Sequence, residues 1–135
     1  MMKTLNYLFL SLGLLLMTSS CGKKVNSNLP AKLVYEQTDQ DLGTVVIEEG
    51  PRVIKYTLRN DGGQYFHLVD VVSTCDCTKT DYNKKPVYGG DDVTIKVTFD
   101  PMDLPEGAFE RMIGVYSNLK KRPDTLYFHG VAKHK

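Results

Sequence analysis

Apolar side chains recur at every second position through most of the chain from Lys32 onward. This spacing predicts strands with one buried face, because successive side chains of a strand point to opposite sides. The clearest run covers residues 92–99, and residues 53–60 repeat it. The side chains that we expect to face the interior are Ile54, Tyr56, Leu58, Val93, Ile95, Val97, Phe99, Ile113, Val115, Ser117, Leu126, Phe128 and Gly130.

Turn-forming residues separate these runs. Asn60-Asp61-Gly62-Gly63 combines residues that tolerate positive φ, which predicts a hairpin at this point. A second turn is predicted over residues 86–91, and prolines at positions 101, 105 and 123 interrupt the later runs. Helical periodicity with capping residues is absent from the sequence. Short strands between such turns favour an all-β fold, an immunoglobulin-like antiparallel β-sandwich of about seven to eight strands.

The start of the chain has the order of a secretory signal: a positive charge at Lys3, a short apolar run, then small residues before Cys21. The apolar run is shorter than the roughly 20 residues that span a bilayer. A cysteine at the cleavage point resembles the lipobox of bacterial lipoproteins, although Thr18 stands where many lipoboxes have leucine. In that family Cys21 is lipidated; in the alternative interpretation it is an ordinary residue after a conventional cleavage site.

These features divide the chain into three parts. We expect a lipoprotein signal peptide at 1–20, a lipidated N-terminus with a short polar tether at 21–31, and one immunoglobulin-like β-sandwich at 32–133. The 17 basic side chains include Lys3, so the mature chain keeps 16, against 16 acidic ones. This balance gives no electrostatic basis for nucleic-acid binding, so we predict no nucleic-acid partner.

Cys75 and Cys77 form a Cys-Asp-Cys segment for which three interpretations remain open. A disulfide between them suits an oxidising compartment, but in an extended strand the two Cα atoms lie near the upper limit of the usual separation, so closure needs a turn. Two thiolates on one face suit copper or zinc, but a complete site needs further ligands, for which the candidates are His67, His129, Met102 and Met112. Packed structural thiols are the third interpretation.

Five motifs follow one another between about Leu33 and Lys133: Asp41-Leu42-Gly43-Thr44-Val45, Thr57-Leu58-Arg59-Asn60-Asp61-Gly62, Ser73-Thr74-Cys75-Asp76-Cys77-Thr78, the stretch from Gly89 to Asp100, and Ser117-Asn118. In these motifs the span resembles the bacterial domain-of-unknown-function family 1573. The sequence departs from the family pattern at Asp76, which replaces a glycine, and at Tyr88-Gly89-Gly90, which replaces a Pro-Gly turn. The resemblance implies an immunoglobulin-like sandwich and no reaction.

Lipoproteins of this kind look typical of the Bacteroidetes. In that group acidic residues soon after the lipidated cysteine favour surface export, and Lys23-Lys24 departs from this pattern. We therefore expect a cell-envelope protein that faces the periplasm, anchored by its N-terminal lipid in the inner leaflet of the outer membrane.

The sequence lacks the motifs of an enzyme. His67, His129 and His134 form no paired-histidine metal motif, and His134 lies in a terminal stretch that we expect to fray. A nucleophile elbow and a Gly-rich phosphate loop are also missing from the sequence. We therefore predict that the protein is not an enzyme and carries no cofactor, with copper or zinc at Cys75 and Cys77 as the alternative.

A binding or scaffolding module for a protein partner fits the sequence better. The irregular segment after the cysteines contains the candidate partner-binding loop Tyr82, Asn83, Lys84 and Lys85. Tyr116 and Tyr127 are expected on outward faces, as aromatic anchors or as ordinary cross-strand packing residues. The alternative function is a thiol site at Cys75 and Cys77 that binds copper or zinc or takes part in disulfide exchange. The sequence leaves the partner and the oligomeric state undetermined.

Overall fold

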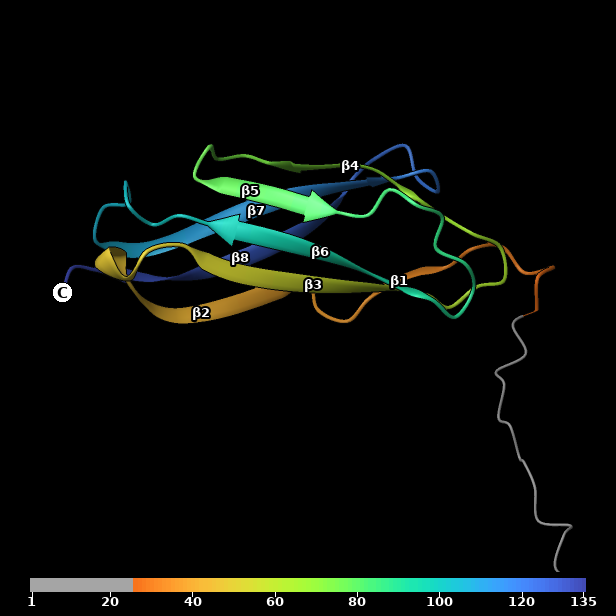
Figure 1. Ribbon diagram of the computed structural model, residues 1–135, viewed down its shortest axis with the longest axis horizontal. Helices are drawn as coiled ribbons and strands as arrows, with labels where there is room; N and C mark the ends of the chain where they lie inside the picture. The colour runs from red at the N-terminus through yellow and green to blue at the C-terminus, as the bar shows by residue number, and fades with distance from the viewer. Residues whose placement is uncertain (1–25) are drawn as a thin grey trace, which may run out of the picture.

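The computed structural model describes residues 26–135, and the alternating runs of the sequence form two four-stranded sheets packed face to face (Figure 1). One sheet has the strand order β1-β3-β6-β5 and the other the order β2-β8-β7-β4. The strands are β1 (Leu33–Tyr35), β2 (Asp39–Val46), β3 (Arg52–Asn60), β4 (Leu68–Ser73), β5 (Thr78–Tyr82), β6 (Asp92–Phe99), β7 (Gly107–Ser117) and β8 (Asp124–Lys133), and a 3-10 turn η1 (Ile47–Glu49) follows β2.

The strand order is that of an immunoglobulin-like sandwich, which confirms the predicted fold class. All neighbouring strands of the first sheet are antiparallel. In the second sheet β7 pairs antiparallel with β4 and with β8, whereas β2 runs parallel to β8. The chain changes sheets between β1 and β2, so its first two strands border different sheets. Within the described residues, no helix is long and apolar enough to cross a bilayer.

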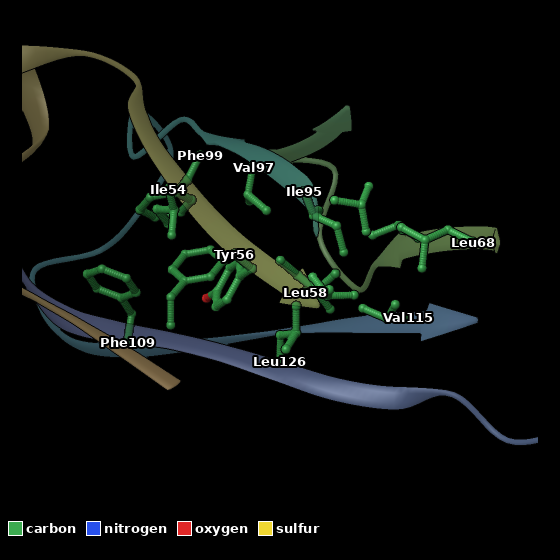
Figure 2. Packing of buried hydrophobic residues seen from close by; sticks show 14 of the residues in the cluster. Ile54, Tyr56, Leu58, Leu68, Ile95, Val97, Phe99, Phe109, Val115 and Leu126 are labelled. Carbon is green, nitrogen blue, oxygen red and sulfur yellow. The ribbon is translucent and has the colours of Figure 1, made fainter. Parts of the chain in front are cut away.

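The core is built from the side chains that the period-two pattern placed inside. Ile54, Tyr56 and Leu58 of β3 are buried against the inward faces of β6, β7 and β8, as Figure 2 shows. Phe99 lies at the centre of an aromatic group, with ring centroids 5.2 Å from Phe109 and 5.0 Å from Phe128. Burial of such aromatic side chains supplies much of the driving force for folding.

The predicted hairpin at Asn60-Asp61-Gly62-Gly63 is wrong. β3 and β4 belong to different sheets, so this segment crosses the sandwich instead of joining paired strands. Its glycines allow this segment to lie close to the segment before β1. A Cβ atom on Gly62 would lie only 2.0 Å from the carbonyl oxygen of Pro30. The segment before β1 is also hydrogen-bonded here, because Gly63 N–H donates to Pro30 O (3.3 Å) and Gln64 N–H donates to Leu29 O (2.9 Å).

Asn60 organises this end of the sandwich with a fully buried side chain. Its amide oxygen accepts the backbone N–H groups of Lys32 (3.1 Å) and Gly62 (2.9 Å). Its amide nitrogen donates to the carbonyl oxygens of Gln64 (2.7 Å) and Val87 (2.9 Å). One side chain thus joins the entry to β1, the β3–β4 crossing and the segment before β6.

The signal peptide and the lipidation of Cys21, together with residues 21–25 of the expected tether, lie outside the described residues.

Candidate functional site

Cys75 and Cys77 are joined by a disulfide in the short turn between β4 and β5. Their Cα atoms are 5.2 Å apart, which lies inside the usual range for a disulfide. The interpretation as free packed thiols is therefore wrong for this structure. The expected extended backbone is absent at this point, because Asp76 and Cys77 occupy a turn that brings the two sulfurs together.

Hydrogen bonds hold this turn independently of the bridge. Thr78 N–H donates to Cys75 O at 3.1 Å, which closes the turn. Cys75 N–H donates to the hydroxyl of Ser73 at 3.2 Å, and that hydroxyl donates to Cys75 O at 3.3 Å. Asp100 N–H donates to Cys77 O at 2.8 Å, so the turn is also fixed to the end of β6.

A cleft of about 370 Å³ opens beside the bridge. The residues that line it are Pro51, Asp76, Cys77, Lys79, Thr98, Asp100 and Asp103. Three carboxylates face one ammonium group in this set, so the cleft has a net negative character at neutral pH. Cys77 is part of its wall, and its side chain is partly exposed.

The bridged cysteines do not fit a copper or zinc site, because a disulfide offers no thiolate to a metal. Among residues 26–135, no three His, Cys, Asp or Glu side chains gather as metal ligands would. The other candidates lie apart in the fold. His67 precedes β4 and its backbone pairs with Asn118, while His129 on β8 lies 3.5 Å from Asp39 and 3.8 Å from Asp41.

Of the candidate partner-binding loop, Tyr82 is the last residue of β5, and Asn83, Lys84 and Lys85 follow the strand. Asn83, Lys84 and Lys85 are exposed, whereas Tyr82 is half-buried and its hydroxyl donates to Asp70 of β4 at 3.2 Å. The ammonium group of Lys84 lies 5.7 Å from the centre of the Tyr82 ring, within the range of a cation–π contact.

Large apolar side chains are exposed on the outer face of the β2-β8-β7-β4 sheet. Val72 of β4 is 45% exposed, and Met112 and Tyr116 of β7 are 42% and 38% exposed. Val72 lies opposite Gly114, so it stands between Met112 and Tyr116 across the strand pair. Tyr127 of β8 is half-buried and lies opposite Met112. These four side chains form what we call the outer-face patch.

The sequence pattern could have revealed most of this patch. The alternation predicts that Tyr116 and Tyr127 face outward, and the structure confirms this: the side chains beside them along the strands are buried, namely Val115, Ser117, Leu126 and Phe128. Val72 and Met112 were not singled out for partner binding. The sequence pattern does indicate that each is a large apolar residue on the outward side of its strand. Only the pairing of β4 with β7, however, brings Val72 and Met112 next to each other.

A comparison with protein families gives a match over residues 33–132 to the family described as "Protein of unknown function (DUF1573)". This match covers most of the chain. The protein belongs to the DUF1573 family. The expected resemblance is therefore confirmed, and the Cys-Asp-Cys turn and the buried Asn60 both lie inside the matched DUF1573 region.

Solved structures share the fold of this DUF1573 domain at low sequence identity. A protein of unknown function from Porphyromonas gingivalis W83 has a TM-score of 0.66 at 12% identity, over 80% of this chain and 50% of that chain. The ASH/PapD-like domain 7 of human CEP192 has a TM-score of 0.58 at 14% identity, over 88% and 98% of the two chains. The VesB protease of Vibrio cholerae has a TM-score of 0.56 at 12% identity, over 73% and 31%.

The DUF1573 domain thus spans half of the Porphyromonas chain and about a third of the protease chain. At these identities the likeness concerns the fold alone. A search of curated proteins gives no match to the sequence.

Proposed function

We propose that this DUF1573 protein is a lipid-anchored, non-catalytic module of the cell envelope that binds a protein partner through its outer-face patch. The observation that carries the proposal is the exposure of Val72, Met112 and Tyr116 side by side on one sheet face. Exposed apolar side chains that cluster on a sheet, with an aromatic residue among them, are typical of protein interfaces.

Bonds across the β4–β5 side of the sandwich favour a face over an edge as the binding surface. The hydroxyl of Thr80 donates to Val71 O at 2.9 Å, and the hydroxyl of Tyr82 donates to Asp70 at 3.2 Å. These bonds tie the outer strand of one sheet to the outer strand of the other. A partner strand that added to β4 or β5 would have to displace them.

The opposite side of the sandwich is tied in the same way. The hydroxyl of Tyr35 on β1 donates to Asp124 of β8 at 3.0 Å, and the side-chain amide of Gln40 on β2 donates to Lys55 O of β3 at 2.7 Å. Burial, with Asp124 beside it, raises the pKa of Tyr35 well above its ordinary value, so this hydroxyl remains a donor.

The candidate partner-binding loop lies next to the outer-face patch, which supports a shared surface. Asp70 accepts the hydroxyl of Tyr82 and lies opposite Tyr116 in the β4–β7 pair. Lys84, which lies over the Tyr82 ring, adds positive charge beside the patch. An apolar centre with a charged border is the usual composition of a transient interface.

The proposal is tested by recovering partners of the tagged full chain from Bacteroidetes cells after chemical crosslinking. We expect the double variant Met112→Asp, Tyr116→Ala to reduce recovery of the partner at least about tenfold, because apolar anchors dominate interface energies. Val53→Asp is the matched control, since Val53 is 55% exposed on β3 of the other sheet. Equal recovery with the double variant and the control would contradict the proposed surface.

A further inference from the structure

The two sulfur atoms of the Cys75–Cys77 bridge have different surroundings. Cys77 lines the acidic cleft beside the turn, and Cys75 is not among the residues of its wall. Cys77 is partly buried against the core on its other side, so the cleft is the route by which an attacking group reaches it. Access of this kind helps to decide which sulfur of a disulfide reacts.

The sulfur of Cys75 is the better leaving group. Its Sγ atom accepts the backbone N–H of Cys77 at 3.2 Å, and a hydrogen bond to a sulfur atom stabilises the thiolate that forms there. Cys77 Sγ has the hydroxyl of Thr78 at 3.6 Å, a longer contact in which either atom can donate. A thiolate that is better stabilised departs faster in disulfide exchange.

We propose that the Cys75–Cys77 bridge is a thiol–disulfide exchange site at which a partner thiolate attacks Cys77 and Cys75 departs. In the first step the partner sulfur bonds to Cys77 Sγ, the bond between Cys75 and Cys77 breaks, and its electron pair stays on Cys75 as a thiolate. A second thiol of the partner then attacks the partner's own sulfur in the mixed disulfide and releases Cys77. Two electrons and two protons pass from the partner dithiol to the two cysteines, and the partner leaves oxidised.

The turn is built to survive this cycle. The hydrogen bonds of Cys75 with Ser73 and Thr78, and of Cys77 with Asp100, involve backbone and hydroxyl groups and not the bridge itself. Reduction therefore leaves the two sulfurs near each other, so that the bridge can form again by the reverse exchange, in which a partner disulfide takes up the two electrons and two protons. This activity does not depend on the protein-binding role proposed above, because it uses a different part of the surface.

The charge of the cleft selects the partner. Asp76, Asp100 and Asp103 face a single ammonium group, that of Lys79. An anionic thiolate is repelled by this set unless neighbouring positive charges accompany it. The structure therefore assigns as substrate a cysteine dithiol flanked by lysine or arginine side chains.

The test uses two synthetic peptides with a single cysteine, one flanked by lysines and the other by glutamates, incubated with the oxidised full chain. The reaction is quenched with acid, free thiols are alkylated, and peptide mapping by mass spectrometry locates the adduct. We expect the peptide on Cys77 and the alkyl group on Cys75. We also expect initial rates roughly tenfold higher for the lysine peptide at low ionic strength, with a smaller difference as salt is added.

Two variants make the test of the cleft specific. Asp103→Asn should reduce the preference for the lysine peptide, whereas Asp81→Asn removes an exposed β5 carboxylate outside the cleft and should preserve it. An adduct mainly on Cys75 would overturn the assignment of the attacked sulfur. Equal rates for the two peptides, or a rate no higher than that of a short unstructured Cys-Asp-Cys disulfide peptide, would overturn the exchange site.

Discussion

At the scale of single residues, Asn60 shows how one polar side chain can be essential to an apolar core. It is completely buried, yet all four hydrogen bonds that its amide group makes are with backbone groups of other segments. Backbone groups of this kind cannot be left without partners inside a protein except at a cost of about 1–3 kcal/mol each. Asn60 therefore contributes more to stability than its polarity suggests.

We expect Asn60→Ala to lower the free energy of unfolding by roughly 3 kcal/mol, because it leaves buried donors and acceptors without partners. Denaturant unfolding followed by circular dichroism measures this change. Asn118→Ala is the matched control, since the Asn118 side chain accepts one hydrogen bond, from His67 N–H at an exposed site. A loss for Asn60→Ala as small as that of the control would show that water replaces the amide.

His134 also behaves differently from what its position in the sequence indicates. Two contacts hold it in the structure: its Nδ1 atom lies 2.7 Å from Glu48 Oε1, and its backbone N–H donates to Glu106 at 2.9 Å. The hydrogen bond between the two side chains lowers the pKa of Glu48 and raises the pKa of His134 from their ordinary values of 4.5 and 6.5. The contact joins the end of the described chain to η1.

The pH dependence of this contact follows from the directions of the two pKa shifts, downward for Glu48 and upward for His134. The contribution of Glu48 to folding stability is present above its ordinary pKa and is lost as pH falls through its lowered pKa in the folded protein. The contribution of His134 to folding stability is present below its ordinary pKa and is lost as pH rises through its raised pKa in the folded protein. The contact is therefore strongest between about pH 4.5 and 6.5.

We expect Glu48→Gln to return the pKa of His134 toward its ordinary value, as measured by NMR titration of the imidazole carbon signals. Glu49→Gln is the control, because Glu49 lies beside Glu48 in η1 and pairs with Arg52 instead. If both variants shifted the pKa of His134 equally, the general charge of η1 and not the hydrogen bond would be the cause.

At the scale of elements, the β4–β5 turn makes its disulfide nearly dispensable for folding. The bridge closes a loop of only three residues, and the loss of chain entropy for a loop of that length corresponds to roughly 1.6 kcal/mol, against about 3 for fifteen residues. The backbone hydrogen bonds of the turn remain when the sulfurs are replaced.

We therefore expect Cys75→Ser with Cys77→Ser to lower the free energy of unfolding by no more than about 1.6 kcal/mol. Chemical denaturation of the oxidised wild type, the reduced wild type and the double variant measures this, and the last two should agree closely. A loss of several kcal/mol would mean that the bridge holds the two sheets together, and would argue against a site that opens and closes.

Element faces could be predicted from the sequence, whereas element partners could not. Alternation is a local property, so the inward sides of β3 and β6 were assigned correctly from residues such as Tyr56 and Ile95. Pairing depends on contacts between distant segments, so the glycines after Asn60 were misread as a hairpin. An extended backbone at Asp76 disfavours the bridge, and the turn that permits it depends on hydrogen bonds such as that from Asp100 N–H to Cys77 O, which join residues distant in the sequence. The outer-face patch required the register of β4 on β7, which no single strand encodes.

At the scale of the whole molecule, the expected anchor can be tested without any knowledge of the partner. We predict that Cys21→Ala abolishes incorporation of labelled fatty acid into the protein and releases it from the membrane fraction, because attachment depends on the acyl chains. The Cys75→Ser, Cys77→Ser variant is the control and should remain in the membrane fraction. Continued labelling of Cys21→Ala would contradict lipidation at this residue.

Residues 26–30, which follow the expected anchor, and the Cys75–Cys77 bridge lie at opposite ends of the sandwich. Leu29 and Pro30 accept hydrogen bonds from Gln64 and Gly63, which follow the end of β3, whereas the β4–β5 turn lies beside Pro51, just before β3 begins. Figure 1 shows the β4–β5 turn and the end of β3 at opposite ends of the sandwich. The nine residues of β3 span roughly 30 Å at about 3.3 Å each. If the chain is attached to a bilayer ahead of residue 26, the Cys75–Cys77 bridge therefore lies at the end of the domain that is farthest from the membrane. It would meet soluble polypeptides in the surrounding compartment sooner than the embedded proteins beside its own anchor.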